Sequence, residues 1–295
     1  MGIAYALLAM LAFATNIIVT RYAVARLPVE AGFFIVLATN VLFPAALFGA
    51  ELAVREAPYG WNWTGAWMFA VGGVVGTFLG RRFLFDTVKL LGPSRASVFH
   101  STSPAFALIA AWLLAGELLG PYEIALMVVV WVGLWLTQPR TGSAHALAPE
   151  VARKGFLAGL LTVAGFGFGN VIRGIAMRNW EEAALGTVIA SVAALACQVV
   201  VTRNWPRIVE QLRAADRTTV LLYIGCGVFT SLGSIFISLA MTRIEIALAV
   251  LVVHTTPLVI FPVSVWLLKN REELTPRTIL GAVLVLAGIA SLALR

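Results

Sequence analysis

The stretch that decides the fold spans residues 95–133 and reads RASVFHSTSPAFALIAAWLLAGELLGPYEIALMVVVWVG. It holds two apolar runs, separated by a short segment that contains Gly116 and Glu117. A helix that crosses a bilayer needs about 20 mostly apolar residues at a rise of about 1.5 Å each. The runs approach that length, and similar runs recur from one end of the chain to the other. The sequence therefore predicts an all-α integral membrane protein, a bundle of spanning helices.

The composition of the 295 residues points the same way, because 60% are hydrophobic and only 12% are charged. Soluble domains carry roughly 25% charged residues, so an ordinary soluble enzyme is excluded. The formal net charge is +7, but the basic residues stand between apolar runs, where lipid headgroups and topology explain them. Membrane lipid is therefore a predicted partner and nucleic acid is not. Cys197 and Cys226 lie inside apolar runs and are expected to be buried thiols.

We place ten membrane-spanning helices in the sequence, with short links that require neighbouring helices to run antiparallel. Their predicted ranges are 3–20, 32–50, 63–88, 94–116, 122–138, 156–175, 183–202, 218–241, 245–268 and 276–294. The longest links lie around 139–154 and 203–217, and the first of them is near the middle of the chain.

The two halves of the chain resemble each other when one is shifted by about 153–155 residues. The matching pairs are spread over the helices and include Gly2 and Gly155, Asn16 and Asn170, Gly80 and Gly233, Pro104 and Pro257, Trp112 and Trp266, Pro121 and Pro276, and Gly133 and Gly288. Five helices is an odd number, so the second copy enters the membrane in the opposite orientation. The sequence thus predicts two inverted five-helix repeats around a central cavity, at 1–138 and 155–295, joined by a linker at 139–154.

The stretch at 95–133 is echoed at 245–289 by EIALAVLVVHTTPLVIFPVSVWLLKNREELTPRTILGAVLVLAGI. Both resemble the repeat of the drug/metabolite transporter superfamily in its ten-helix EamA branch. The shared pattern is Ala-Ser, then Pro, then Gly-Glu at the helix end, then Gly in the next helix. The second copy departs from it, with Asn270 and Arg271 where the first has Gly116 and Glu117. The resemblance implies export of amino acids, other small metabolites or organic cations, and it is closest to bacterial amino-acid exporters.

The fourth helix of each repeat carries a proline, Pro104 or Pro257, preceded by hydroxyl side chains and a histidine. Prolines inside a helix free backbone carbonyls, which membrane helices tolerate where they line a cavity. We therefore expect helix kinks at the cavity, with a set of candidate substrate-binding residues beside them: His100, Ser103, His254 and Thr256. The alternative is that the hydroxyls bond back to helix carbonyls and the prolines only shape packing. Recurrence at the repeat interface favours the cavity.

Asn16 and Asn170 form another matched pair, midway along the first helix of each repeat. An amide in hydrocarbon needs a partner, so each asparagine either faces the cavity or bridges two helices. Both stay candidates for substrate binding. Asn40 has no counterpart, because Ala194 occupies the matching position.

Charges inside spans are rare and usually functional, and the third helix carries Arg81, Arg82 and Asp86. Arg82 and Asp86 are four residues apart and are predicted to pair, which leaves Arg81 as the unpaired cation. Arg173, near the end of the sixth helix, is a further charge of this kind. The alternative is that these side chains snorkel to the headgroups.

A cavity for an amino acid must satisfy both a carboxylate and an ammonium group. Arg81 is the predicted carboxylate partner, because its planar guanidinium binds a carboxylate through two hydrogen bonds. The ammonium group is assigned to neutral oxygens and to carbonyls that the prolines free, the side chains being those of Asn16, Asn170, Ser103 and Thr256. His100 and His254 titrate near neutral pH and offer a coupling to protons.

Small residues form stripes on the third helix of each repeat, and close packing is their expected role. The stripes are Gly72, Gly76 and Gly80 in the first repeat, and Ser231, Ser234 and Ser238 in the second.

The ends of the spans carry aromatic and acidic residues with predicted structural roles. Trp61, Trp63 and Trp180 are expected to anchor span ends at the membrane interface. Glu117 matches the acid that the family has at a helix end, and we expect it to cap a helix or pair with a loop rather than to carry a proton.

Other functional classes are ranked lower. The sequence has no P-loop, no Gly-rich nucleotide fingerprint and no Cys/His metal spacing, so neither an ATP-driven pump nor a cofactor or metal site is predicted. A secondary transporter that works by alternating access is the leading hypothesis. The runner-up is a membrane enzyme or a flippase for lipid headgroups, which needs a clustered catalytic set. A channel ranks third.

Basic residues are distributed unevenly between the two predicted faces. Of the 21 Lys and Arg residues, 5 fall on the face that bears both termini and 16 on the other. Basic loops remain in the cytoplasm, so the termini are expected outside, in a multi-pass protein of the plasma (inner) membrane. Because one chain carries both repeats, it is expected to function as a monomer.

Overall fold

The computed structural model describes residues 1–56, 60–91, 96, 99, 102–118, 120–137, 149–256, 259–260 and 276–293. Within these residues it shows helices and no strands, which confirms the all-α prediction. The helices are α1 (Gly2–Val24), α2 (Val29–Val54), α3 (Trp63–Gly72), η1 (Gly73–Gly80), α4 (Arg81–Leu91), α6 (Ser103–Ala110), η2 (Ala111–Ala115), α7 (Pro121–Thr137), α8 (Pro149–Asn179), α9 (Ala183–Val201), α10 (Trp205–Ala214), α11 (Arg217–Met241), α12 (Ile246–Val253) and α14 (Pro276–Ala293).

Among the described residues, six helices are long and apolar enough to cross a membrane, which makes this a multi-pass membrane protein. They are Gly2–Val24, Val29–Val54, Trp63–Leu91, Pro149–Asn179, Ala183–Val201 and Arg217–Met241. Ser103–Ala115 and Ile124–Gly133 are shorter apolar segments in the predicted fourth and fifth spans.

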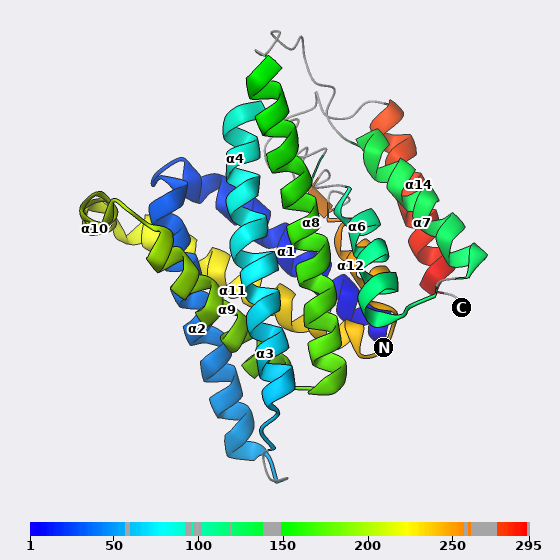
Figure 1. Ribbon diagram of the computed structural model, residues 1–295, viewed down its shortest axis with the longest axis horizontal. Coiled ribbons are helices and arrows are strands. Elements are labelled where there is room, and N and C mark those ends of the chain that lie inside the picture. The colour runs from blue at the N-terminus through cyan, green and yellow to red at the C-terminus, as the bar shows by residue number, and fades with distance from the viewer. Residues whose placement is uncertain are drawn as a thin grey trace.

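The helices of one half pack mainly on helices of the other, and the pattern is symmetric (Figure 1). The first helix of one repeat contacts the third and fourth of the opposite repeat: α1 lies against α11 and α12, while α8 lies against α3, η1, α4 and α6. The second helices, α2 and α9, contact each other, as do the fifth helices, α7 and α14. Exchanging the two halves leaves this contact pattern unchanged, as a pair of inverted repeats requires.

Matched glycines lie at matched contacts. A Cβ atom on Gly80 would lie 3.2 Å from the ring of Phe166 on α8, and one on Gly233 would lie 2.8 Å from the ring of Phe13 on α1. Gly80 and Gly233 correspond between the repeats, and so do Phe166 and Phe13 at the same shift of 153 residues. The shared sequence pattern therefore encodes the same packing twice.

The glycine stripe on the third span brings two backbones together, as expected. A Cβ atom on Gly169 of α8 would lie 2.3 Å from the Cα atom of Gly76 in η1, and one on Gly165 would lie 2.8 Å from the Cα atom of Gly80. No side chain larger than hydrogen fits there without a shift of the helices. This contact joins the two halves at the middle of the third span.

The pair α7 and α14 stands at the edge of the bundle (Figure 1). Its contact also uses matched glycines, since a Cβ atom on Gly133 would lie 2.8 Å from the carbonyl oxygen of Gly281. A Cβ atom on Gly288 would lie 2.4 Å from Val130.

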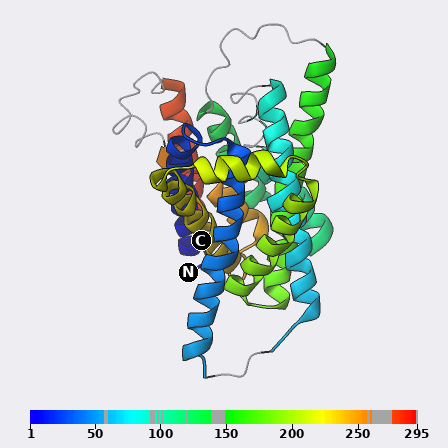
Figure 2. The same ribbon diagram turned by 90° about the vertical axis from the view of Figure 1, so that its left-hand side faces the viewer.

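The sequence did not predict α10, which lies in the expected link at 203–217. It runs across α2, and Figure 2 shows it lying crosswise to the spanning helices. Asn204 caps its first turn by accepting a hydrogen bond from the Arg207 amide. Ile208 is buried against α2, and the Trp205 ring lies 5.1 Å from the Phe34 ring.

Two other departures from the predicted spans concern helix geometry and length. The third span contains a π-helical segment, η1, and the fourth ends in another, η2; such segments are uncommon and often occur at functional sites. The third span of the second repeat, α11, is α-helical throughout. Helix α8 begins at Pro149, inside the predicted linker.

Candidate functional site

Pro104 stands where the helical segment α6 of the fourth span begins. It lies in the first turn of α6, where a missing amide leaves no helical hydrogen bond unmade. In the second repeat α12 ends at Val253, and a turn follows before Pro257. The residue before a proline disfavours helix, which accounts for the break at Thr256. Pro257 and His100 lie outside the described residues.

Hydroxyl groups beside this turn bond back to the helix. Thr255 Oγ1 and Thr256 Oγ1 each donate to a carbonyl oxygen three residues earlier, at 2.6 Å. The Nδ1 atom of His254 lies 2.8 Å from the Val250 carbonyl oxygen. The Ser103 hydroxyl, at the matched position in α6, is buried and has no hydrogen-bond partner among the described residues. A hydroxyl that donates to a carbonyl can still accept a hydrogen bond, so each group retains an acceptor.

The matched asparagines Asn16 and Asn170 are both half-buried. Asn16 Oδ1 accepts a hydrogen bond from Thr20 at 3.4 Å, and Asn170 makes no hydrogen bond within the described part of the chain. Asn40 has the bridging role instead, because it is buried and shares a 3.2 Å hydrogen bond with Ser231 of α11.

Arg81 starts α4 directly after η1 and is half-buried. Its guanidinium carbon lies 5.1 Å from the centre of the Phe33 ring on α2, a cation–π contact. Among the described residues, no carboxylate lies within 4.0 Å of it.

The predicted ion pair between Arg82 and Asp86 is wrong: the described residues show none between them. Arg82 is exposed on the helix surface and Asp86 is half-buried. Spacing of four residues permits a pair but does not hold two side chains together where one of them faces outward. Arg81 still has no acidic partner within 4.0 Å among the described residues, although the pair from which this was predicted does not form.

Arg173 on α8 is 7% exposed, the most deeply buried cation of the described chain. Its Nη2 atom donates to Thr77 Oγ1 in η1 at 3.2 Å, and its Nε atom has no hydrogen-bond partner within the described part of the chain. The sequence placed Arg173 near a span end, yet helical side chains lean toward the helix N-terminus. The guanidinium therefore reaches Thr77, at the middle of the third span. Its position near a predicted span end did not indicate this depth, because the depth depends on the direction in which the side chain leans.

Glu117 caps a helix of the other repeat, as predicted, and it also forms a buried ion pair. Its carboxylate accepts hydrogen bonds from the amides of Ile246 and Ala247, at 2.9 and 3.4 Å, in the first turn of α12. Arg178 at the end of α8 donates to it at 2.6 Å and also to the Met241 carbonyl at 3.3 Å. The Glu117 side chain is only 6% exposed. We call this side of the bundle, where α1 begins and α8 ends, the Glu117 end.

Trp180 also lies at the Glu117 end. It was predicted to be an anchor at the membrane interface, but its side chain is buried between the repeats instead. Its ring is buried, and its Nε1 donates to the Gly60 carbonyl at 3.1 Å. Trp61 packs on it with ring centres 5.2 Å apart, while Trp63 is exposed. Trp180 is one element of a closed contact between the two repeats.

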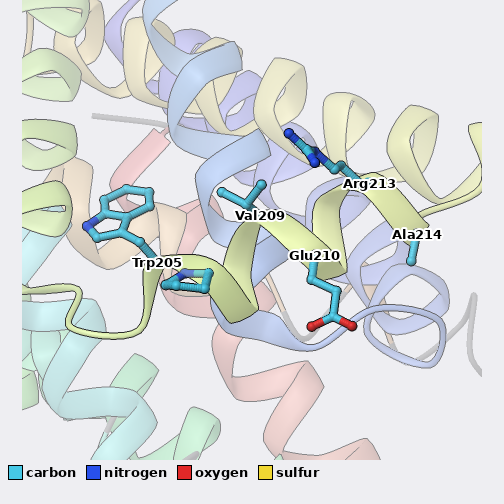
Figure 3. A pocket seen from close by; sticks show the side chains of 6 residues that line it. Trp205, Val209, Glu210, Arg213 and Ala214 are labelled. Carbon is cyan, nitrogen blue, oxygen red and sulfur yellow. The ribbon is translucent and has the colours of Figure 1, made fainter.

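A pocket lies away from these residues, on the exposed side of α10. It is an open pocket of about 680 Å³ lined by Trp205, Pro206, Val209, Glu210, Arg213 and Ala214 (Figure 3). None of the predicted site residues lines it. No group of three or more His, Cys, Asp or Glu side chains that could hold a metal ion occurs in the described residues.

Comparisons with known proteins place this architecture in a family. A search of the curated proteins finds no match. A crystal structure described only as that of a protein has a TM-score of 0.75 at 19% identity, covering 99% of this chain and 96% of that one, which shows a shared fold. The sequence model of the EamA-like transporter family matches residues 1–138 and again 153–294. The chain therefore belongs to the EamA-like transporter family, as its resemblance to the EamA branch implied, and is a membrane transporter of the drug/metabolite superfamily rather than an enzyme.

Proposed function

We propose that this transporter exports small zwitterionic metabolites, with amino acids as the substrate class, across the plasma (inner) membrane by alternating access. One chain holds both repeats and acts as a monomer. The contacts between opposite repeats support the proposal, because rocking of one inverted repeat against the other is the usual basis of alternating access.

The observation that carries the proposal is the state of Arg81. It is a half-buried cation whose described contact is the face of an aromatic ring rather than an acid. A cation inside a membrane protein is costly without a counter-charge. A substrate carboxylate supplies that charge, and the planar guanidinium binds it through two hydrogen bonds.

The ammonium group of the substrate is assigned to neutral oxygens from both repeats. Helix α6, with Ser103, contacts α8, with Asn170, and α12, before Thr256, contacts α1, with Asn16. The buried Ser103 hydroxyl has no hydrogen-bond partner among the described residues, so it is available to accept a hydrogen bond from a substrate. These contacts between helices of opposite repeats support the assignment of acceptors from both repeats. His100 and His254 are the proposed route by which proton movement couples to transport.

The test uses purified protein in proteoliposomes, counterflow of labelled amino acids as the readout, and two neighbouring arginines. Arg81→Ala removes hydrogen bonds to a charged group, each worth about 1.5–3 kcal/mol, so apparent affinity should fall roughly tenfold to a hundredfold. Arg82→Ala is the matched control, since Arg82 is exposed on the same helix, and it should keep wild-type flux. If Arg81→Ala keeps wild-type flux while His254→Ala loses it, Arg81 is not the residue that binds the substrate carboxylate. Movement of lipid headgroups without amino-acid flux indicates a flippase instead.

A further inference from the structure

Arg173 is a buried cation that the proposed site leaves unused. Its side chain offers five hydrogen-bond donors, and the described structure gives it one side-chain partner, Thr77, at 3.2 Å. The Nε atom is buried and finds no acceptor among the residues that the structure describes. Buried charges in proteins are paired or hydrogen-bonded because an unpaired one is strongly disfavoured. Arg173 therefore needs an acceptor, and an anionic one satisfies it best.

The protein itself supplies no such anion in its described part. No carboxylate lies within 4.0 Å of Arg173 or Arg81. The described acidic residues lie in links or within five residues of a helix end. Thr77, by contrast, lies at the middle of the Trp63–Leu91 span. The interior thus holds two cations that are not neutralised by these acids.

The two cations are linked by one short segment of backbone. Arg173 bonds to Thr77 within η1, and Arg81 follows Thr77 by four residues, directly after η1 ends. The glycine contact between Gly76 and Gly169 places the backbones of η1 and α8 against each other at this level. This close contact holds Arg173 of α8 next to the segment that carries Thr77 and Arg81.

From this arrangement we infer that Arg173 and Thr77 form a second anion-binding subsite, and that the substrate is a dicarboxylic amino acid. One carboxylate binds Arg81 and the other binds Arg173, where Thr77 holds the guanidinium in place. This inference rests on the proposed function, since it assigns the second group of the same substrate. It also disfavours organic cations as substrates, because two cations repel them.

Aspartate and asparagine are the probes that isolate the second carboxylate, because they differ in charge at nearly constant size. Counterflow in proteoliposomes is measured for both, with the wild-type chain expected to prefer aspartate by at least about tenfold. In Arg173→Gln the aspartate flux should fall roughly tenfold to a hundredfold while the asparagine flux is maintained. Arg153→Gln, an exposed arginine on the same helix, should leave both fluxes at wild-type values.

A second variant tests the inference even if Arg173→Gln does not fold. Thr77→Val removes the hydroxyl at constant shape, and it should lower aspartate flux and leave asparagine flux unchanged. Stabilisation of the purified protein by aspartate, seen as a higher Tm, should shrink in the same variant.

The remaining outcomes are distinguishable. No preference for aspartate, or equal loss of both fluxes in Thr77→Val, overturns the second subsite while amino-acid transport stands. Asparagine flux could also require chloride in the wild type and lose that requirement in Arg173→Gln. That result identifies an inorganic anion as the occupant of the Arg173 subsite and overturns the assignment of a substrate carboxylate to it. Absence of flux for every amino acid contradicts the proposed function itself.

Discussion

The two ends of the bundle are held together in different ways. At the Glu117 end, the two ion pairs that join different helices are short and have one buried partner: Arg178 to Glu117 at 2.6 Å and Arg55 to Glu182 at 2.7 Å, with the two acids 6% and 7% exposed. A third pair at this end, Arg55 to Glu51 at 3.8 Å, links neighbouring turns at the end of α2. At the opposite end, which we call the Asp216 end, the pairs are long and open to solvent. Arg26 and Asp216 are 3.8 Å apart, at 51% and 58% exposure. Lys89 and Glu30 are 3.5 Å apart, at 64% and 67%.

The contrast shows at which end of the bundle ion pairs stabilise the contacts between helices. Exposed ion pairs contribute about 0–1 kcal/mol, so those at the Asp216 end add little to the contact between helices. Loss of the partner of a buried acid is destabilising, so the pairs at the Glu117 end hold α2 to α9 and, through Glu117, α8 to α12. In the proposed transport cycle, the Glu117 end must break these bonds to open.

Glu117→Gln should lower the stability of the protein more than any other substitution proposed for the two ends. It removes the charge that Arg178 and the α12 amides share, at a cost of about 1.5–3 kcal/mol for a hydrogen bond to a charged group. Thermal unfolding should occur at a lower Tm, and hydrogen exchange should speed up at Ile246 and Ala247. Glu245→Gln is the control, because Glu245 is exposed at the same end and its side chain caps nothing. An unchanged exchange rate at Ile246 would show that Glu117 does not hold α12.

Arg55→Ala is expected to come next. It leaves the Glu182 carboxylate, only 7% exposed, without its 2.7 Å partner, and a buried unsatisfied group costs about 1–3 kcal/mol. The measurement is again Tm in detergent. Arg55→Ala combined with Glu182→Gln should recover part of the loss, since the stranded charge is gone. A double variant less stable than the sum of the two single losses would contradict pairing as the cause.

Asp216→Ala should have a smaller effect, confined to the Asp216 end. Asp216 caps α11 by accepting hydrogen bonds from the amide and hydroxyl of Thr219. The hydroxyl bond of Thr219 holds the pKa of Asp216 below its ordinary value, and Arg26 adds to this. A lowered folded-state pKa means that the stabilisation is present at neutral pH and is lost as the pH falls through that pKa. The variant and wild type should therefore differ in Tm at pH 7 and converge below about pH 4; a difference that persists in acid argues against the cap.

Lys89→Ala should have the smallest effect. Both partners of the Lys89–Glu30 pair are largely exposed, so the change in free energy of unfolding should stay below about 0.5 kcal/mol. Unfolding measured at low and at high salt checks this. The free energy of unfolding should change with salt to the same extent in the wild type and in the variant. A loss as large as that of Arg55→Ala would remove the contrast between the two ends.

The repeat was predictable because its matching residues lie at matching contacts. Gly80 and Gly233 face corresponding phenylalanines, and Gly133 and Gly288 both lie between α7 and α14. A close contact between backbones permits no larger side chain, so the glycines persist in both copies and are visible in the sequence. Glu117 was also assigned correctly, because an acid just past a span end naturally meets helix amides.

Several features were not predictable from periodicity. Helix α10 is short and carries charges, and its burial depends on Ile208 meeting α2, which is a tertiary contact. The helix face that exposes Arg82, and so prevents its pairing with Asp86, depends on neighbouring helices in the same way. The sequence around Pro104 is compatible both with a kink inside a helix and with the first turn of a helix, so it does not distinguish the two. Arg173 was noticed as a charge but not as a site residue, because its depth depends on the direction in which its side chain leans.

The pairing of α1 with α11 sets an order of events during synthesis. Helix α1 lies against α11 and α12 and makes few contacts with α2, which follows it directly. The chain between Val24 and Arg217 is 192 residues long, and at roughly 5–20 residues per second its synthesis takes roughly 10–40 s. Throughout that interval the first helix is in the membrane without the partner it packs against. Completion of the first repeat therefore waits for the second, and the protein assembles as a whole rather than half by half.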